Sequence, residues 1–433
     1  MVFHIPMIAK FENRTKRDYP ESLLKTQVAD MTQSDFLHER DPTALTTDLR
    51  TLAALALVPA IGLGIARFSY ALLLPSMSSS LGWSYADAGW MTSVNAAGYL
   101  IAALISARFI GVVGANRVMR TGIFACVIAL IMMGVFRHTA LLNISWFLAG
   151  LGGASAFIAG GVIAAQVSQR HPARASFLLG IFYAGPGLGI VLSGVGVPWV
   201  LSHWGTTAWP NAWLALAAIS VVLALGVVWG VRVMPQSRVQ AHASAPLASM
   251  QWMLVGYGFF GAGYITYMTF MIAWIQSHGE SAAFQSLFWI VLGLAVTVFP
   301  WLWAGVLQNQ RHGRAFAMLN GLTLIGAALP LMSSAWPVLL ASSAVFGCAF
   351  FGVVASTTAF VRRNCHASSL ASGIGAMTVA FSIGQTLGPT LSGWLNDLTG
   401  GLTVGLLTSA VFLSAAALIG LLQKDFGAGL SAQ

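Results

Sequence analysis

After Arg50, the sequence consists of twelve apolar segments of about 20 residues or more, separated by short polar or basic stretches. A helix of about 20 residues crosses the roughly 30 Å hydrocarbon core of a bilayer, so each segment is long enough to span it once. In lipid the backbone must satisfy its own hydrogen bonds, and a helix does this within a single segment. The sequence therefore predicts an all-α integral membrane protein with twelve transmembrane helices.

The overall composition leads to the same conclusion. Of 433 residues, 57% are apolar and 8% are charged, whereas about 25% are charged in a typical soluble domain. Such a chain cannot cover itself with a water-soluble surface. The formal net charge of +9 comes from basic residues that stand singly or in small groups between the apolar segments. Because a nucleic-acid-binding domain needs a clustered basic face, no nucleic-acid partner is expected.

The segments fall into two sets of six. The first set is expected at 51–76, 86–108, 116–136, 140–166, 174–201 and 209–233. The second set is expected at 251–276, 283–307, 313–333, 336–361, 368–395 and 402–422. We therefore predict a six-helix bundle over 51–233, an exposed cytoplasmic linker over 234–250, rich in Pro, Ser and Arg, and a second bundle over 251–422.

The two ends of the chain are polar. Residues 1–50 mix acidic and basic side chains and lack the apolar core of a signal peptide, which predicts a mostly disordered tail. A short second tail covers 423–433. Met31 precedes the first segment by a short lead, so both Met1 and Met31 are possible native starts.

Lysine and arginine are distributed unequally between the two sides of the predicted membrane. Of the 21, 19 lie in the tails or in alternate loops, which face the same side. The other two are Arg137, in an opposite-side loop, and Arg67, inside the first segment. Basic residues are retained on the cytoplasmic side of a membrane, so we expect both termini to be cytoplasmic. A single false segment would destroy this alternation, and the charges therefore support the count of twelve independently.

Several motifs in one half have weak counterparts in the other. Gly62-Leu63-Gly64 matches Gly261-Ala262-Gly263, and Gly185-Pro186 followed by Gly189 matches Gly388-Pro389 followed by Gly393. The two offsets are nearly the same, as is typical of the repeated halves of transporters. The two bundles are therefore expected to be pseudo-symmetric.

The loop after the eighth segment carries a family signature. It reads Gly305-Val306-Leu307-Gln308-Asn309-Gln310-Arg311-His312-Gly313-Arg314. Together with the six-plus-six division, it resembles the major facilitator superfamily, whose gate loop reads G-x-L-x-D-R-x-G-R-R. Asn309 replaces the acid, one residue is inserted, and the corresponding loop from Ser106 to Arg120 has no acid. The resemblance implies gating roles for Gly305, Asn309, Arg311 and Arg314, while the missing acids argue against a charge relay.

The first segment narrows the resemblance to a branch. From Gly62 to Met77 it is similar to the G-x-G-R-F-x-Y-x-x-x-L-P-x-M motif of the bacterial YbfB/YjiJ-like transporters, with an extra Ala66. The resemblance implies a twelve-helix rocker fold in a bacterial inner membrane, with the first, fourth, seventh and tenth segments around a central cavity. It also implies a secondary transporter without a cofactor, and we expect a monomer.

Arg67 is the candidate for substrate recognition. It lies about 5 Å beyond the middle of the first segment, where a buried arginine costs about 3 kcal/mol on insertion scales. The acids nearest to any segment core, Asp87, Glu280 and Asp397, all lie near outer ends. Arg67 is therefore interpreted as the partner of an anionic substrate in a wet cavity, or alternatively as bound to helix carbonyls or to an outer acid such as Asp87.

Further candidates for substrate binding lie on the first segment, on the seventh segment and on others. Tyr70 shares the face of Arg67 and is either a ligand contact or an interfacial anchor. The seventh segment carries an aromatic stripe at helical spacing, interpreted as an aromatic wall for an organic ligand or as ordinary packing. The stripe comprises Tyr257, Phe260, Tyr264, Tyr267, Met271 and Trp274. Asn95 and Gln385 are buried polar candidates for the cavity, with interhelical hydrogen bonding as the alternative.

The two Gly-Pro pairs, Gly185-Pro186 and Gly388-Pro389, remove a helix hydrogen bond and permit close helix approach. We assign them to kinking and conformational change. The first resembles the superfamily's G-x-x-x-G-P-x-x-G antiporter motif, with Ile181 in place of its first Gly.

These features predict a secondary transporter of a small organic anion, with coupling to protons left open. One alternative is an effluxer of amphiphilic compounds in which Arg67 is structural, and another is a membrane sensor that binds without transport. An enzyme is not expected, because no paired carboxylates lie within the segments and all nine His lie in the tail, in loops or at segment ends. The three cysteines show no metal-binding spacing, so no metal is expected.

Overall fold

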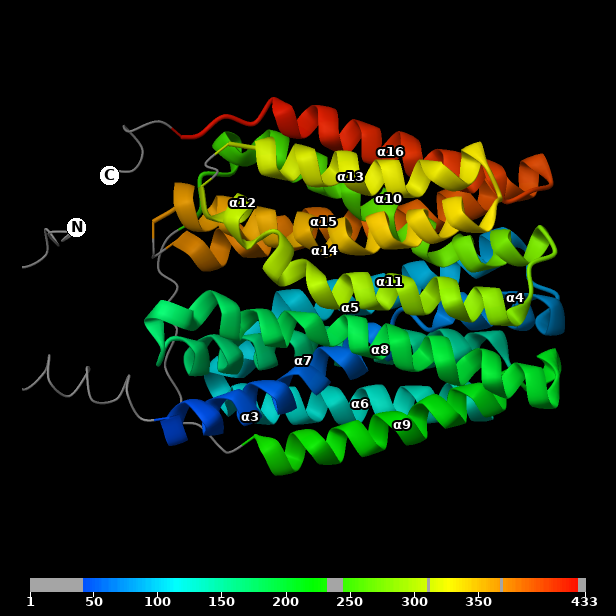
Figure 1. Ribbon diagram of the computed structural model, residues 1–433, viewed down its shortest axis with the longest axis horizontal. Coiled ribbons are helices and arrows are strands. Elements are labelled where there is room, and N and C mark those ends of the chain that lie inside the picture. The colour runs from blue at the N-terminus through cyan, green and yellow to red at the C-terminus, as the bar shows by residue number, and fades with distance from the viewer. Residues whose placement is uncertain (1–41, 232–243, 310–311, 367–368, 427–433) are drawn as a thin grey trace, which may run out of the picture. The chain divides into compact units, whose positions relative to one another are not determined.

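The computed structural model of the protein describes residues 42–231, 244–309, 312–366 and 369–426 (Figure 1). By its contacts the chain divides into two units, Met1–Arg50 and Thr51–Gln433. The described part of the first unit is the beginning of helix α3 (Pro42–Pro59). The remainder of α3 and all other described elements belong to the second unit, and they are helical.

The first half of the second unit contains the remainder of α3, a π-helical turn η1 (Ala60–Ile65) and α4 (Tyr70–Leu81), which together form the first segment. It continues with α5 (Tyr85–Val113), α6 (Ala115–Val135), α7 (Thr139–Ser168), α8 (Ala175–Trp204) and α9 (Trp209–Gly230). Short 3₁₀ turns, Pro172–Arg174 and Thr206–Ala208, precede α8 and α9.

The second half begins with a 3₁₀ turn η4 (Leu247–Met250) and α10 (Gln251–Ser277). It continues with α11 (Ala282–Leu302), α12 (Ala304–Asn309), α13 (Arg314–Met332), α14 (Trp336–Asn364), α15 (Leu370–Thr399) and α16 (Thr403–Leu421). Most of the expected linker lies outside the described residues.

Eleven helices in the described residues are long and apolar enough to cross a membrane, counting Leu45–Leu81 as one. α15 is not among the eleven, but with 30 residues it is long enough to be the twelfth, and it is rich in Gly, Ser and Thr. The structure thus confirms the all-α fold of a multi-pass membrane protein.

Four details of the prediction are wrong. Residues 42–50, assigned to the disordered tail, are helical; residues 1–41, which include Met31, lie outside the described residues. The first segment is interrupted between Ile65 and Tyr70, for reasons given below. The eighth is split into α11 and α12 at Trp303, because Pro300 weakens the last turn of α11.

The fourth error is the loop from Ser106 to Arg120. α5 continues to Val113 and α6 starts at Ala115, so the loop is reduced to Gly114, whose φ of 90° suits glycine. Arg108 does not end the helix, because a long basic side chain can extend from an apolar helix toward water.

The two halves meet most extensively along two helix pairs, α5 with α15 and α8 with α11, and α4 also contacts α10. Glycines permit these contacts. A Cβ atom on Gly187 of α8 would lie 2.4 Å from the carbonyl oxygen of Gly293 in α11. The backbones of the two halves therefore pack closely along these helices.

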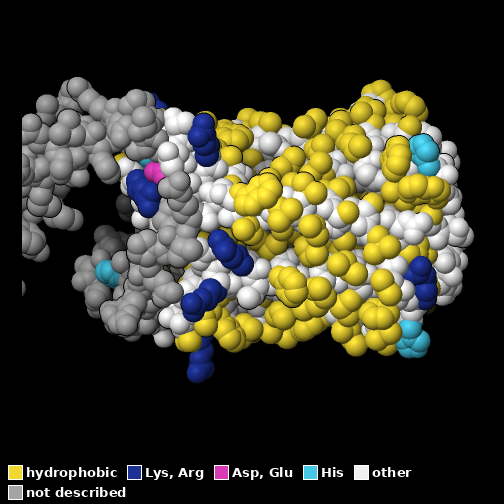
Figure 2. All heavy atoms as spheres, turned by 90° about the horizontal axis from the view of Figure 1, so that it is seen from below, with side chains coloured by type: hydrophobic (Ala, Val, Ile, Leu, Met, Phe, Trp, Pro, Cys, Tyr) yellow, Lys and Arg dark blue, Asp and Glu magenta, His cyan; other side chains and the backbone are white. Residues whose placement is uncertain are grey.

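The surface of the helices is apolar. The face shown in Figure 2 is covered largely by hydrophobic side chains, while Lys and Arg gather mainly toward one end. Large apolar residues such as Phe124, Val222 and Leu418 are at least 65% exposed, as expected for side chains that face lipid.

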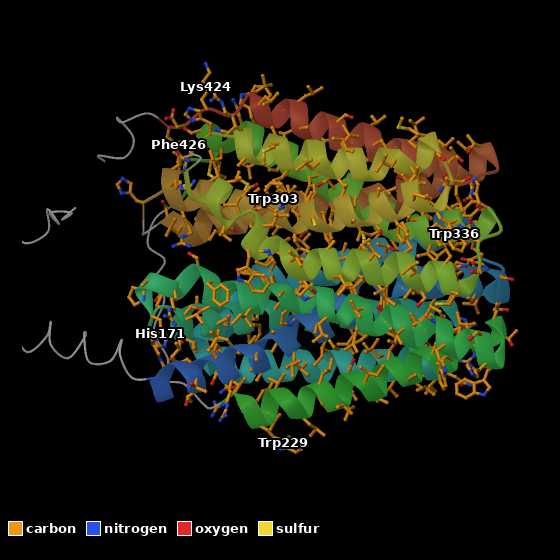
Figure 3. All side chains as sticks on the ribbon, viewed as in Figure 1. His171, Trp229, Trp303, Trp336, Lys424 and Phe426 are labelled. Atoms are coloured by element: carbon orange, nitrogen blue, oxygen red, sulfur yellow. The ribbon has the colours of Figure 1, made fainter. Side chains whose placement is uncertain are left out.

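The two ends of the helices can be distinguished. His171, Lys424 and Phe426 lie at one end, which we call the basic end, and Trp336 lies at the opposite end (Figure 3). The side-chain oxygen of Asn364, at the end of α14, accepts a hydrogen bond from the backbone of Phe426 at 3.3 Å, which places the last turn of α14 at the basic end.

Candidate functional site

The break in the first segment follows from two glycines that pack against neighbouring helices. A Cβ atom on Gly62 would lie 3.0 Å from Gly153 of α7, and one on Gly64 would lie 2.5 Å from Gly189 and from the carbonyl oxygen of Pro186 in α8. The backbone of η1 therefore lies directly against both helices. π-helical turns of this kind are frequent at functional sites.

Arg67 lies in the irregular turn directly after η1. It is 8% exposed, and its guanidinium carbon lies 4.9 Å from the centroid of the Tyr99 ring in α5. Its Nη2 donates a long hydrogen bond of 3.5 Å to the hydroxyl of Tyr264 in α10, while Nη1 is buried without a hydrogen-bond partner in the described residues. The cation is thus stabilised by aromatic groups rather than neutralised.

The outer acid considered as a partner for Arg67 is occupied elsewhere. Asp87 forms a capping box with Ser84 at the start of α5, where its carboxylate accepts from the Ser84 backbone at 3.0 Å. The described residues contain no salt bridge to Arg67. Pairing of Arg67 with Asp87 is therefore not what the structure shows.

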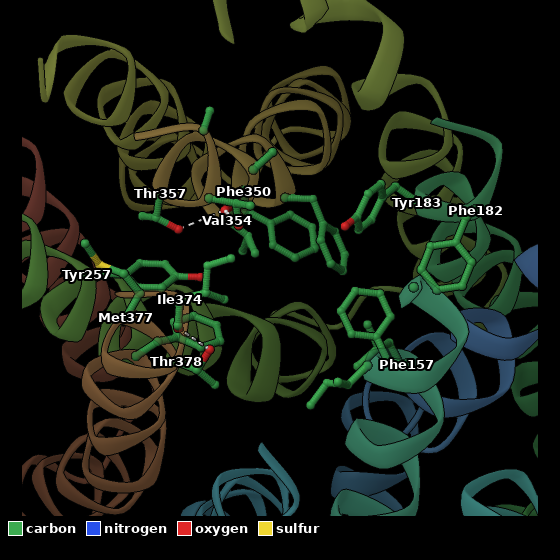
Figure 4. Close-up of a pocket in the computed structure, with 18 of the residues that line it drawn as sticks. Phe157, Phe182, Tyr183, Tyr257, Phe350, Val354, Thr357, Ile374, Met377 and Thr378 are labelled. Carbon is green, nitrogen blue, oxygen red and sulfur yellow. Dashed lines mark hydrogen bonds between the residues drawn. The ribbon is translucent and has the colours of Figure 1, made fainter. Parts of the chain in front are cut away.

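A cavity of about 510 Å³ lies between the two halves and includes Arg67. Aromatic side chains form much of its wall: Phe68, Tyr99, Phe157, Phe182, Tyr183, Tyr257, Tyr264, Phe299, Phe350, Phe351 and Phe381. The charged side chains among the described residues of the wall are Arg67 and Arg362, and both are positive. Figure 4 shows Tyr257 and Tyr183 on opposite sides of the open space, one from each half.

Part of the wall is a column of nearly parallel rings from three helices of the second half. Phe381 of α15 lies between Tyr257 and Tyr264 of α10, with centroid distances of 4.6 and 5.5 Å and interplanar angles of 13° and 9°. Tyr264 also stacks on Phe350 of α14 at 5.6 Å. Because Tyr264 contacts Arg67 through its hydroxyl, the column leads directly to the buried cation.

The cavity reaches the basic end. Arg362 belongs to the last turn of α14 and is exposed, so the wall extends from the buried Arg67 to the surface there.

At the opposite end the halves are joined by direct contacts between α5 and α15. The carboxylate of Asp397 accepts hydrogen bonds from the backbone of Tyr85 at 2.8 Å and Ala86 at 2.9 Å, and Ser93 and Thr390 share a hydrogen bond of 2.7 Å. The structure therefore has one end open and the other closed.

Of the predicted substrate-binding residues, the structure brings Arg67, Tyr257 and Tyr264 together in the cavity wall. Four others are not part of the described wall. Tyr70 donates to the carbonyl oxygen of Ala88 at 3.0 Å, Asn95 donates to that of Trp146 at 3.0 Å, and Tyr267 shares a hydrogen bond of 2.6 Å with Ser342. Gln385 is fully buried, and neither of its amide atoms has a partner among the described residues.

The predicted gating glycines and prolines lie at close backbone contacts. A Cβ atom on Gly185 would lie 2.0 Å from the carbonyl oxygen of Ala56, and one on Gly388 would lie 2.7 Å from Ala262. Pro186 and Pro389 lie inside the continuous helices α8 and α15. These positions therefore set how closely the helices approach.

The predicted gate loop is only partly described. Gly305 belongs to α12 and has open space where a Cβ atom would lie, so no neighbour among the described residues requires a glycine there. Asn309 ends α12, Arg314 is exposed at the start of α13, and Arg311 lies outside the described residues. Arg363 of α14 donates to the carbonyl oxygen of Leu307, which links α12 to α14.

Sequence reasoning missed Tyr99, Tyr183, Phe350 and Phe381, all of which line the cavity. None of them belongs to a long aromatic stripe at helical spacing such as that of the seventh segment. The consecutive Phe350 and Phe351 in the tenth segment, one of those expected around the cavity, were the available signal.

Two six-helix halves around a cavity that is open at one end define a membrane transporter. The model of the family described as the uncharacterised MFS-type transporter YbfB matches residues 59–421, and the chain belongs to that family. This confirms the resemblance seen in the sequence and the prediction that the protein is not an enzyme. A comparison with curated proteins gives no match.

Solved transporter structures share the fold. A bacterial homologue of the human lysosomal transporter Spinster, in an inward-facing and unoccupied conformation, has a TM-score of 0.66 at 13% identity, covering 87% of this chain and 97% of that one. A mutant of the nucleoside transporter NupG has a TM-score of 0.62 at 17% identity, covering 87% and 98%. FucP, in the outward conformation, has a TM-score of 0.58 at 13% identity, covering 87% and 98%.

Proposed function

We propose that this transporter carries a small organic anion across a bacterial inner membrane by alternating access, with Arg67 binding the anionic group. The observation that carries the proposal is that Arg67 lines the cavity while its buried Nη1 has no hydrogen-bond partner in the described residues. A guanidinium presents a planar pair of donors that fits a carboxylate, sulfonate or phosphate. An anion would supply the compensation that this cation lacks.

The proposed cycle starts from the state described above. The basic end faces the cytoplasm, because basic loops are retained there, and both termini lie on that side. The anion enters past Arg362, which raises its local concentration, and reaches Arg67 at the far end of the cavity. The halves 51–233 and 251–422, joined by the linker 234–250, then rock about the cavity as a monomer.

Proton coupling, if present, is expected to require none of the outer acids individually. Asp87 caps α5, Asp397 accepts from Tyr85 and Ala86, and Glu280 accepts from the Trp336 indole at 2.7 Å. None belongs to the described cavity wall. The simplest carrier of a proton is then the acid group of a weakly acidic substrate.

We expect Asp87→Asn and Glu280→Gln to exchange substrate at rates within about fivefold of wild type, because each keeps a hydrogen-bond acceptor for the existing donor and loses only the charge. The effect of the charge is less than about 1 kcal/mol at a site that is at least partly exposed. The measurement is counterflow in proteoliposomes. Complete loss of exchange in a folded, inserted Asp87→Asn protein would show that this acid is part of the coupling.

The test of the proposed function is a thermal-shift panel on the purified full chain. Organic carboxylates, sulfonates and phosphates are each compared with a neutral counterpart, such as the matching amide. A ligand that binds the folded state alone raises the melting temperature, by about 2.7 kcal/mol of added stability at a hundredfold excess over its Kd. We expect charged members to stabilise and their amides not to; stabilisation by neutral members alone would contradict the proposal.

Efflux of amphiphilic compounds is the second candidate, since the aromatic wall would suit it. It requires binding that does not depend on charge or on Arg67. Binding of anions without flux in proteoliposomes would instead favour a sensor.

A further inference from the structure

The surroundings of Arg67 are aromatic on several sides. Its guanidinium lies over the Tyr99 ring, and its chain neighbour Phe68 meets Phe350 and Phe351 edge-on, at centroid distances of 6.1 and 6.3 Å. An anion bound to Arg67 would therefore place the rest of its body among ring faces and edges.

The first half contributes aromatic rings to the opposite wall. Phe157 of α7 stacks on Phe182 of α8 at 5.6 Å and meets Tyr183 edge-on at 6.1 Å (Figure 4). Rings from both halves thus face the space in which a substrate body would lie.

The polar groups of the described wall offer no charged partner to a cationic group of a substrate. The hydroxyls of Thr357 and Thr378 already donate to the carbonyl oxygens of Val354 and Ile374, at 2.9 Å each. Among the described residues of the wall there is no Asp, Glu, Asn, Gln, His or Lys. The hydroxyls of the wall come mainly from tyrosines, which suit an aromatic body, whereas an amino acid would leave its ammonium group without a carboxylate partner.

We infer that the substrate is an aromatic anion, an aryl carboxylate or sulfonate of one or two rings without an amino group. This inference rests on the proposed role of Arg67 and adds the class of the organic body. Its acid group binds Arg67, and its ring packs against the column that contains Tyr264, Phe350 and Phe381.

Three probes of similar shape separate the two parts of this inference. They are 2-naphthoate, its saturated analogue decahydro-2-naphthoate, and the neutral 2-naphthamide. Saturation removes the π face but makes the body more hydrophobic, so a merely apolar cavity would bind the saturated acid at least as well. Each aromatic pair between ligand and wall tightens binding by a factor of about 2 to 12, in addition to the effect of buried area.

We expect calorimetry on the full chain in nanodiscs to show 2-naphthoate binding at least about fivefold more tightly than the saturated acid. Equal or tighter binding of the saturated acid would overturn the aromatic inference and leave the anion site standing. Equal binding of 2-naphthamide would instead contradict the role of Arg67. Failure of all three to bind at millimolar concentration would also overturn the inference.

Two matched variants test the ring column. Phe381→Leu removes a ring of the wall, whereas Phe346→Leu removes a ring that stacks on Phe350 at 5.2 Å but does not belong to the wall. We expect Phe381→Leu to weaken 2-naphthoate about fivefold without affecting the saturated acid, and Phe346→Leu to affect neither. If Phe381→Leu weakens the binding of both ligands equally, the ring of Phe381 contributes only apolar volume.

Discussion

Gly89→Ala is expected to prevent closure at the opposite end of the helices and to abolish substrate exchange. A Cβ atom on Gly89 of α5 would lie 2.2 Å from the carbonyl oxygen of Pro389 in α15 and 2.7 Å from its carbon. Both atoms belong to the backbone of the other half, so no side-chain rotation relieves the clash. Overpacking of this kind costs about 1–3 kcal/mol, which shifts the equilibrium by about 5- to 150-fold toward the state in which the halves are apart at this end.

The shift can be followed by pulsed electron resonance between spin labels on cysteines at two exposed positions, Ala140 in the first turn of α7 and Ser334 in the loop between α13 and α14. Labelling requires a background without Cys126, Cys348 and Cys365. We expect a longer distance in Gly89→Ala than in the background protein.

The matched control is Gly111→Ala on the same helix, where a Cβ atom meets nothing within 4 Å. It should leave both the distance and the exchange rate unchanged. An unchanged distance with normal exchange in Gly89→Ala would show that this contact plays no part in the transport cycle.

Arg67→Met is expected to stabilise the ligand-free protein while removing anion binding. A buried polar group without a partner costs about 1–3 kcal/mol, and the Nη1 of Arg67 is such a group. Methionine keeps the apolar length of the side chain without the charge, so the free energy of unfolding should rise by an amount in that range. If Arg67 served the packing of the helices instead, the melting temperature would fall.

The loss of binding should be large. Two charge-assisted hydrogen bonds contribute about 1.5–3 kcal/mol each, so their removal weakens binding by about 100-fold or more. Arg67→Lys keeps the charge but not the planar pair of donors, and we expect a loss of about tenfold. Equal affinities of Arg67→Lys and wild type would show that charge alone, without bidentate geometry, binds the ligand.

Much of the fold could be predicted, because the length of a transmembrane helix and the apolarity of its surface are local properties of the sequence. The helix α6 runs from Ala115 to Val135 where 116–136 was expected, and α16 runs from Thr403 to Leu421 where 402–422 was expected. Helix ends that were placed at a basic residue were predicted less accurately, as Arg108 shows. A long basic side chain can extend out of the bilayer while its helix continues.

The break in the first segment could not be predicted. It depends on the contacts of Gly62 with Gly153 of α7 and of Gly64 with Gly189 of α8. Both contacts join residues that are far apart in the sequence. The glycines are visible in the sequence, but their partners are set by tertiary packing.

The candidate site was predicted only in part for a similar reason. Helical spacing shows that Tyr264 and Tyr267 share a face of the helix. It does not show which part of that face lines the cavity. Tyr264 lines the cavity, while Tyr267, one turn further, bonds to Ser342 in the packed second half. Phe350 and Phe381 come from other helices, and their meeting with Tyr264 depends on how those helices are rotated.

The central claim, that the protein transports an organic anion bound by Arg67, is tested most directly by uptake into proteoliposomes. The radiolabelled anion that gives the largest thermal shift is supplied to vesicles containing wild type or Arg67→Met, with the melting temperature of each protein measured in parallel. We predict saturable uptake by wild type, competed by the unlabelled anion but not by its amide, and background uptake by an Arg67→Met protein that melts no lower. Undiminished uptake by Arg67→Met would contradict the account.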